Sequence, residues 1–579
     1  MKTLILSAIR CSLMFLVPSI TYAISTQWDL DPISGDWNTA ANWTPNGVPN
    51  GPADTATFGL SHTSDVSISA NTEVNSIIFT PAATNPYTIS VSFGFTLTLS
   101  GTGIINNSGT TQHFVANGGE ANSGEFGSIR FTNSATAGSS TTFTNNHGTN
   151  GFFGGITLFS DTSTAGSATF INKNGTVGES QGETVFFDNS TAGNGTFINN
   201  GSIISNLVNS GSTGFFDSST AGNATITNNG AAASDTFGGI TFLANNSSAS
   251  NGTFINNAGT VSGAFGGFTD FLGNATAASS TLIANGATIG GAGGGQIFFS
   301  ADSTGGTSRI EVFGNGFLDI SDHSGRRGVT IGSIEGDGDS FLGANNLTVG
   351  SNDLSTTFSG VIQDGGVNGG VGGSLTKIGT GTLDLTGAST YTGSTNVNRG
   401  VLQVDGSISS NTSVRGRGTL AGTGTINGNV TNNGRVSPGE ALGAPGMLTV
   451  VHSYTQAQFA TLMIQIAGMN TGQFSVLNVM GNADLNGFLD PVLLNGFVPS
   501  IGDSFVFLDS ASLTGAFSRI LRPVFNNGTE QWSVIYQNNN AILTVGPNTI
   551  PDLGSTFLLL TLGLLGLMTY RRQLLRGQS

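Results

Sequence analysis

A repeat of about 28 residues limits the folds open to this chain more than any other feature of its sequence. A small Ala/Gly element, typified by Thr164-Ala165-Gly166, recurs seven times, and its copies are centred on residues 137, 165, 192, 221, 249, 277 and 305. One unit of this length cannot enclose a hydrophobic core, so successive copies must stack to bury their apolar side chains. We therefore expect a repetitive, solenoid-like body.

Two apolar positions keep register with this repeat. Six residues before each centre stand Phe131, Phe159, Phe186, Phe215, Leu243, Phe271 and Phe299. Five residues after it stand Phe170, Phe197, Ile226, Phe254, Leu282 and Ile310, and the first copy slips by one residue to Phe143. Two residues further on stand Asn172, Asn199, Asn228 and Asn256. Stacking at strand spacing, about 4.8 Å, would place each apolar residue over the next and form ladders of Asn side chains at the corners.

The segments around these positions are short and rich in Thr, Phe and Ile, with Gly or Asn runs between them, which predicts strands and turns. Helical periodicity is absent. The pattern favours a parallel β-solenoid. A stack of antiparallel hairpins, or a partly disordered low-complexity stretch, is the alternative.

Composition and charge restrict the partners. Of 579 residues, 88 are Gly and only 9% are charged, and the net charge is −16. Such a surface repels nucleic acid phosphates and anionic lipid, so we expect neither as a partner. Neutral glycans and divalent cations remain compatible with it. The single cysteine, Cys11, lies in the N-terminal apolar segment, so the rest of the chain has neither a disulfide nor a Cys-based metal site.

Residues 1–23 have the layout of a secretory signal. Lys2 precedes an apolar stretch, and the small residues Thr21 and Ala23 predict cleavage after Ala23. A buried N-terminal helix is the alternative. The layout predicts export.

The C-terminal segment combines a short motif, an apolar run and an Arg cluster. The uncharged run Leu553–Tyr570 predicts one transmembrane helix, and the basic residues Arg571, Arg572 and Arg576 would stop it on the cytoplasmic side. Directly before and within the start of this run stand Pro551, Asp552, Gly554, Ser555 and Thr556.

This order resembles the PEP-CTERM class of bacterial sorting signals, and the motif is closest to its VPDSG-type variant. Leu553 stands where that variant has Ser. The resemblance implies a transient inner-membrane anchor and processing by an exosortase, a membrane protease-transpeptidase. A plain membrane anchor is the alternative, because hydropathy does not separate the two.

Other segments resemble bacterial autotransporter passenger domains. Leu375-Thr376-Lys377, Gly379-Thr380-Gly381-Thr382-Leu383, Tyr391-Thr392-Gly393 and Gly400-Val401-Leu402 closely resemble the autotransporter-associated β-strand repeat, which implies a right-handed β-helix coil. Around Trp37 and Trp43 the sequence resembles the opening module of such proteins, and these two side chains are expected to cap the first coil.

One stretch concentrates charge in a chain that is otherwise almost free of it. Arg309, Glu311, Asp319, Asp322 and Arg326, with His323 and Arg327, suggest an alternative function, a polysaccharide lyase or hydrolase with its site around residues 309–327. A junction between two repeat types explains the same residues without catalysis. Glu335-Gly336-Asp337-Gly338-Asp339 offers oxygen ligands for calcium, but it lacks the spacing of an EF-hand and is expected to be a solvated turn.

The expected fold is therefore all-β: a parallel right-handed β-helix with coils of about 28 residues, a C-terminal β region and one C-terminal transmembrane helix. The expected divisions are a signal peptide (1–23), a capping module (24–125), the seven-copy solenoid (126–312), the autotransporter-associated repeat region (313–447), a C-terminal β region (448–545) and a sorting tail (546–579). We expect no catalytic residue, metal or cofactor. The predicted function is that of a structural or adhesive protein at the cell surface, in the outer membrane or outside the cell, where an extracellular polysaccharide or a surface is its partner.

Overall fold

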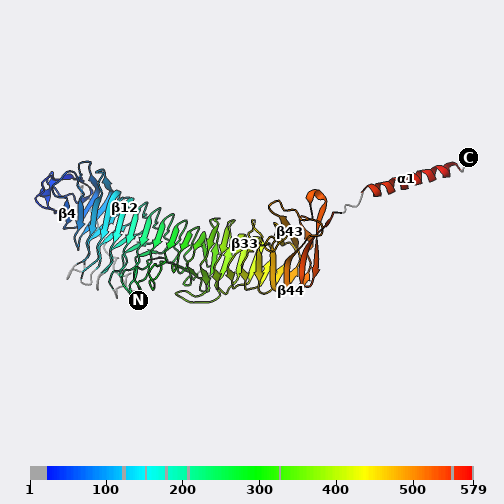
Figure 1. Cartoon of the computed structure of the whole chain (residues 1–579). Coiled ribbons are helices and arrows are strands. Elements are labelled where there is room, and N and C mark those ends of the chain that lie inside the picture. Colours follow the sequence, from blue (N-terminus) through cyan, green and yellow to red (C-terminus); the bar gives the residue numbers. More distant parts are fainter. Residues whose placement is uncertain are drawn as a thin grey trace. The chain divides into compact units, whose positions relative to one another are not determined.

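The computed structural model describes residues 23–119, 125–149, 153–175, 180–204, 209–324, 328–441, 443–548 and 553–576. These residues form two compact units. The first comprises residues 1–227 and 235–241, and the second comprises residues 228–234 and 242–579. Within each unit, the strands of successive turns lie side by side, blue to green in the first and green to red in the second (Figure 1).

The first unit contains parallel strands in two sheets. Sheet A of this unit has the order β2-β1-β3-β5-β7-β9-β11-β13-β15, in which only the β1–β2 pair is antiparallel, and sheet B has the order β4-β6-β8-β10-β12-β14. The elements are β1 (Ser25–Trp28), η1 (Ala40–Asn42), β2 (Trp43–Thr44), β3 (Gly51–Phe58), β4 (Asp65–Ile68), β5 (Thr72–Phe79), β6 (Thr88–Val91), β7 (Thr96–Asn106), β8 (Gln112–Ala116), β9 (Ser128–Phe131), β10 (Ser139–Asn145), β11 (Ile156–Phe159), β12 (Ser167–Asn172), β13 (Glu183–Phe186), β14 (Thr196–Asn199) and β15 (Ser212–Phe215). Strands β16 (Thr225–Asn228) and β17 (Ile240–Leu243) include residues of both units.

The second unit continues the parallel arrangement and ends in antiparallel strands. Its elements are β18 (Thr253–Asn256), β19 (Phe268–Phe271), β20 (Thr281–Ala284), β21 (Gln296–Phe299), β22 (Arg309–Val312), β23 (Phe317–Asp319), β24 (Val329–Ile331), β25 (Ser333–Gly336), β26 (Asp339–Phe341), β27 (Asn346–Val349), β28 (Thr356–Phe358), β29 (Val361–Gln363), β30 (Ser374–Lys377), β31 (Thr382–Leu385), β32 (Ala388–Ser389), β33 (Thr395–Val404), β34 (Ser407–Ile408), β35 (Thr412–Gly422), β36 (Thr425–Ile426), β37 (Val430–Asn432), β38 (Arg435–Pro438), β39 (Met447–Val450), β40 (Tyr454–Gln456), β41 (Thr461–Ile466), β42 (Val476–Leu485), β43 (Phe488–Leu493), β44 (Ser504–Gly515), β45 (Arg519–Ile520), β46 (Val524–Phe525), η2 (Asn526–Gly528), β47 (Glu530–Gln537), β48 (Asn540–Pro547) and α1 (Leu553–Arg576).

Three sets of parallel strands wind through this second unit. Its sheet A begins β19-β21-β23-β26-β29, its sheet B begins β18-β20-β22-β25-β28-β31-β33, and a third sheet, C, begins β24-β27-β30-β33. Strands β44, β48 and β47 form an antiparallel sheet at the end of the unit.

Two continuous stacks of Phe rings run through the repeats of the first unit. On sheet A, Phe131, Phe159, Phe186 and Phe215 stack with ring centroids 4.7, 4.7 and 4.8 Å apart. On sheet B, Phe114, Phe143, Phe170 and Phe197 stack at 4.9, 4.8 and 4.7 Å. The two stacks meet edge to face, as at the 5.7 Å contact of Phe159 with Phe170. These spacings equal the separation of paired strands, so the repeat places each ring directly over the next.

The Asn residues form a buried ladder beside the Phe stacks, where the sequence predicted a ladder at the corners. Asn145 Nδ2 donates to Asn172 Oδ1 at 2.7 Å, and Asn172 Nδ2 donates to Asn199 Oδ1 at 2.8 Å. All three side chains are fully buried. Each Oδ1 also accepts a hydrogen bond from a Thr hydroxyl of sheet A, as from Thr184 to Asn172 at 2.9 Å. The ladder therefore ties sheet B to sheet A with satisfied polar groups.

The Thr-Ala-Gly element forms the turn between the two sheets. In the third full copy, Ala192 is buried, the Gly193 N–H donates to Thr191 Oγ1 at 3.1 Å, and Gly193 has a φ of +59°. Glycine takes this left-handed conformation without the steric cost that a side chain brings. In a later, degenerate copy, Ala278 is held at a φ of +50°.

This geometry predicts different effects on stability for two small substitutions. Gly193→Ala should lower the free energy of unfolding by about 1–2 kcal/mol, because left-handed backbone disfavours a Cβ, and this Cβ would lie 2.8 Å from the Gly166 carbonyl oxygen. Ala278→Gly, at the equivalent position, should lose no stability. Urea unfolding of the two full-length variants measures the difference, and equal losses would contradict the assigned turn.

Three buried Trp side chains close the first turn of the first unit. Trp43 lies 5.1 Å from Trp28 and 4.9 Å from Trp37, ring centroid to ring centroid, and all three pack against Phe58. Each indole N–H donates to a backbone carbonyl, so no polar atom of the three rings is left unpaired. Trp37 and Trp43 thus occupy the capping position expected from the sequence.

The prediction of an all-β solenoid is confirmed, with about 18 turns in the two units together and about 27 residues per turn. The predicted transmembrane helix is not confirmed. Residues 553–576 do form a helix, α1, but among the described residues no helix combines the length and apolarity needed to cross a membrane. The described side chains of α1, residues 561–573, include the charged pair Arg571 and Arg572.

Candidate functional site

A polar row crosses five consecutive turns on the outer face of sheet B in the second unit. It consists of Glu311 on β22, Glu335 on β25, Thr357 on β28, Asp384 on β31 and Gln403 on β33. Glu311 pairs in register with Glu335, Thr357 pairs with Asp384, and Asp384 pairs with Gln403. Strands alternate inward and outward residues, so the neighbours of these five side chains, such as Ile310 and Leu383, point into the core.

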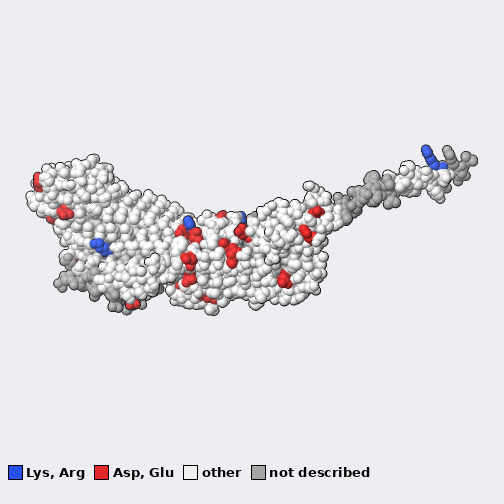
Figure 2. Space-filling model, viewed as in Figure 1, with Lys and Arg blue, Asp and Glu red and all other residues white. Residues whose placement is uncertain are grey.

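This row lies in a concavity of about 530 Å³. Arg309 lies at one end, and its Nε is 3.2 Å from Glu311 Oε1 and also pairs with Glu335 Oε1. The ring of Phe313, which is 38% exposed, forms part of the wall. Figure 2 shows acidic side chains gathered over this middle part of the chain, with few basic ones among them. We call this concavity the sheet B groove.

The carboxylate of Asp384 lines the groove, and that of Asp405 lies next to it. Burial, followed by the nearby negative charge of Asp405, raises the pKa of Asp384 to about 6. Asp405 is itself held by the side chain of Gln403, whose Nε2 donates to it at 2.7 Å, and by the backbone and hydroxyl of Thr423. Asp384 is therefore partly protonated in mildly acidic solution, while the usual pKa of a free Asp is near 3.9.

The raised pKa of Asp384 makes the free energy of unfolding depend on pH. The folded chain holds the Asp384 proton more tightly than the unfolded chain does, so the contribution of Asp384 to stability is fully present below about pH 4. It is lost as the pH rises through about 6. Asp384→Asn should remove this dependence and raise the free energy of unfolding at pH 7.5 by about 1 kcal/mol, after allowance for solvent screening. Urea unfolding between pH 4 and pH 7.5 measures it, and an unchanged pH profile would contradict the assignment.

The structure separates the charged residues considered as an alternative catalytic cluster. Arg309 and Glu311 lie on β22 of sheet B, whereas Asp319 lies on β23 of sheet A. Asp322 is exposed in the turn that follows β23. Arg326 and Arg327 lie outside the described residues.

Asp319 has a structural role in its own surroundings. Its carboxylate accepts hydrogen bonds from the Ser321 N–H at 2.7 Å and from the Val367 N–H at 2.8 Å. It is 2% exposed. It therefore anchors the Gly-rich loop that contains Val367, and a Cβ at Gly366 would lie 2.7 Å from either of its oxygens.

The segment considered for calcium is divided among different contacts. Glu335 pairs with Arg309, Asp337 Oδ1 accepts the Gly314 N–H at 2.8 Å, and Asp339 lies on β26 of sheet A. Within the described ranges, no three His, Cys, Asp or Glu side chains are grouped as metal ligands would be.

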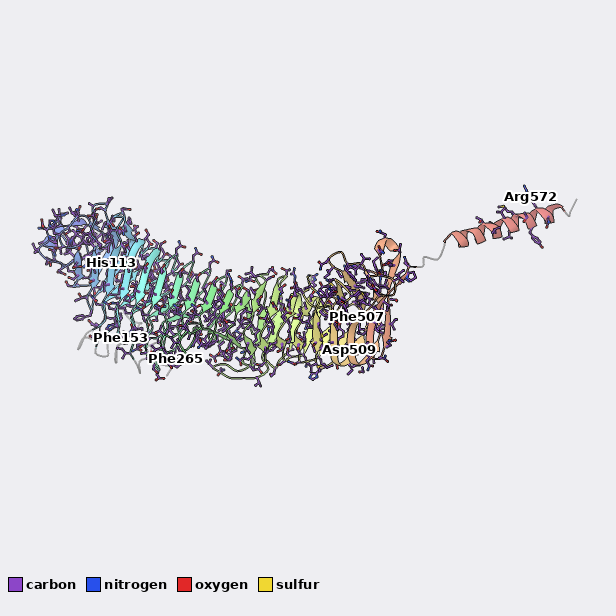
Figure 3. The ribbon with its side chains drawn as sticks, in the orientation of Figure 1. His113, Phe153, Phe265, Phe507, Asp509 and Arg572 are labelled. Carbon is purple, nitrogen blue, oxygen red and sulfur yellow. The ribbon has the colours of Figure 1, made fainter. Side chains whose placement is uncertain are left out.

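The predicted processing residues lie at the two ends. Ala23 is described and exposed. Pro551 and Asp552 lie outside the described residues. Gly554, Ser555 and Thr556 are in the first turns of α1, Arg576 is its last residue, and the exposed Arg571 and Arg572 lie near its C-terminal end, where Figure 3 labels Arg572.

The sequence analysis singled out Arg309 and Glu311 in one charged cluster and Glu335 in a separate segment. It did not identify Thr357, Asp384 or Gln403, or the one site that these residues form together. The available signal is strand alternation: each of the three is the polar residue before or after a buried apolar residue of a short strand. Alternation gives the outward face of one strand only. It does not say which strands are neighbours.

A comparison with known protein families gives one match, and it falls on the second unit. Residues 375–404, which include β30, β31, β32 and β33, match the family model described as passenger-associated-transport-repeat. The chain contains a passenger-associated transport repeat. This match confirms the resemblance identified from Leu375 to Leu402.

No curated protein matches the sequence. Among solved structures, the crystal structure of the Haemophilus influenzae Hap adhesin is similar, with 11% sequence identity and a TM-score of 0.26. The similarity covers 86% of this chain and 65% of the adhesin, so this chain spans less than two thirds of that protein's length.

Proposed function

We propose that this chain is an exported, passenger-like β-solenoid that acts as a structural or adhesive protein at the cell surface or in the extracellular matrix. The observation behind this proposal is the regular outward row of the sheet B groove, which repeats from turn to turn at strand spacing. A periodic surface of this kind suits contact with extended or repetitive partners. The transport repeat at residues 375–404 supports an origin among passenger-type proteins.

The proposal assigns the chain a binding role and no catalysis. Among the charged side chains of residues 309–327, Arg309 and Glu311 lie on sheet B, whereas Asp319 lies on sheet A and is already engaged in two hydrogen bonds. General acid–base chemistry on a glycosidic bond needs paired carboxyl groups flanking one substrate position. An extracellular polysaccharide or a surface is the proposed partner.

Adhesion of the whole protein tests this function. Beads coated with the full-length chain should be retained under flow on films of extracellular polysaccharide, while beads coated with an unrelated acidic protein are washed off. Equal loss of both kinds of bead would contradict the proposal. The appearance of new reducing or unsaturated ends in the polysaccharide would also contradict it, because it would indicate an enzyme.

The C-terminal motif supports a separate proposal, processing by an exosortase-like enzyme. Pro551 and Asp552 precede the apolar run Leu553–Tyr570, and Gly554, Ser555 and Thr556 lie at its start. The basic residues Arg571, Arg572 and Arg576 follow it. Mass spectrometry of the protein recovered from its native cells tests it. A new C-terminus near residues 554–556 and an N-terminus after Ala23 are expected, whereas retention through Ser579 would contradict processing.

A further inference from the structure

We propose that the sheet B groove, comprising Glu311, Glu335, Thr357, Asp384, Gln403 and the wall residue Phe313, binds a neutral linear glycan that lies along the solenoid axis. This inference rests on the proposed adhesive function and names the site and the class of ligand. Each of the five row residues comes from a different turn, so the groove presents one polar side chain per strand spacing of about 4.8 Å.

The periodicity of the groove favours a linear polymer over a compact ligand. Glu311 and Glu335 are register partners, as are Thr357 and Asp384, and Asp384 and Gln403, so the row follows a straight line of paired strands. A ligand built from repeated units meets the same kind of contact at every turn. The 530 Å³ concavity is within the range of ligand sites.

The chemistry of the groove suits hydroxyl groups. Carboxylates accept hydrogen bonds only, whereas the Gln403 amide and the Thr357 hydroxyl both donate and accept. Sugar hydroxyls donate and accept in the same way and so satisfy both kinds of partner. Phe313, which is 38% exposed, offers an apolar surface against which the apolar face of a sugar ring packs.

Charge argues against an acidic glycan. Arg309 is the basic side chain that lines the groove, and it is already paired with Glu311 and Glu335. Three carboxyl groups facing one guanidinium leave the groove negative, and the chain as a whole has a net charge of −16. A uronic or sulfated chain would therefore be repelled.

The polar row is limited at both ends. On the preceding turn, the outward register partner of Glu311 is Ile283, and on the turn after Gln403 it is Ala421. Neither side chain forms hydrogen bonds. The row is therefore limited to five turns, with an apolar side chain at the position directly before it and at the position directly after it.

Titration calorimetry of the full-length protein tests the inference with a panel of neutral hexasaccharides: β-glucan, mannan, galactan and xylan fragments. At least one should bind with a dissociation constant below about 1 mM. Hexagalacturonate should not bind. Thr357→Arg places a long side chain across the groove and should weaken binding at least tenfold.

A matched variant and a measurement of folding show whether Thr357→Arg weakens binding by blocking the groove or by disturbing the fold. Thr431, like Thr357, is an exposed Thr in the middle of a strand of the second unit, and Thr431→Arg should leave binding unchanged. Circular dichroism should show the same thermal transition for both variants. Binding that survives Thr357→Arg, stronger binding of the acidic hexasaccharide, or no binding by the neutral panel would each overturn the inference. If bead adhesion persists in those cases, the proposed adhesive function stands and only the groove is excluded.

Discussion

Asn172→Ala should lower the free energy of unfolding of the first unit by about 3 kcal/mol, because it leaves several buried polar groups without partners. Asn172 Nδ2 donates to Asn199 Oδ1 at 2.8 Å and to the Ser212 carbonyl at 2.7 Å. Its Oδ1 accepts hydrogen bonds from Asn145 Nδ2 and from the Thr184 hydroxyl. Urea unfolding of the full-length chain measures this loss.

A surface Asn provides the control for this variant. Asn194 follows the turn at Gly193 and is exposed, and Asn223 Nδ2 donates to its side chain at 3.1 Å. Asn194→Ala should change the free energy of unfolding by less than about 0.5 kcal/mol, as exposed substitutions usually do. Similar losses for both variants would contradict the buried ladder as a source of stability.

Phe170→Ala should cost about 4 kcal/mol, the largest loss that we expect from a single substitution in this chain. Phe170 is fully buried and touches three rings: Phe143 at 4.8 Å, Phe197 at 4.7 Å and Phe159 at 5.7 Å between centroids. Removal of its ring interrupts the sheet B stack and opens a cavity that rigid strands on either side cannot close.

Phe187 tests whether this loss depends on the interior stack. Its ring stacks on that of Phe216 at 5.3 Å, but the side chain is half-buried on the outside of the turn. Phe187→Ala should therefore cost less than half as much as Phe170→Ala, measured in the same denaturant series. A loss of the same size for the two variants would contradict the assignment of Phe170 to the core.

The interior of the first unit was predictable because its turns have nearly equal lengths. Constant spacing aligns Phe159 with Phe186 and Asn172 with Asn199 in the sequence itself. Asn145 escaped detection because β10 contains a register shift between Ser139 and Thr142, which moves its Phe and Asn one residue later. Phe114 escaped because it precedes the repeat element that defined the period.

The sheet B groove was not predictable as a unit, because its turns have unequal lengths. Glu311, Glu335, Thr357, Asp384 and Gln403 are separated by 24, 22, 27 and 19 residues, so no single period brings them into one row. Loops of variable length absorb these differences without disturbing the strand register. Only the three-dimensional pairing shows which polar residues are neighbours.

Lys377 illustrates a second limit of sequence reasoning. A Lys at a strand end is normally expected at the surface, yet this side chain points into the solenoid and is 1% exposed. Its Nζ donates to the Ile378 carbonyl, and burial lowers its pKa to about 8. The alternation of apolar and polar residues assigns the inward positions of a strand to apolar residues. It therefore places Lys377 at the surface, although this side chain is buried and donates to a backbone carbonyl.

Disulfide cross-linking across the groove tests the stacked, in-register solenoid most directly. Engineered cysteines are easy to follow in this chain, because its only native cysteine is Cys11. In a Cys11→Ser background, Thr357→Cys with Asp384→Cys places two thiols on paired positions of neighbouring turns. Paired strands bring Cα atoms within disulfide range, whereas strands two turns apart are separated by roughly 9.6 Å. Under mild oxidation the account predicts a disulfide between residues 357 and 384 and none between cysteines placed at 335 and 384. The absence of the first cross-link, or equal formation of both, would contradict it.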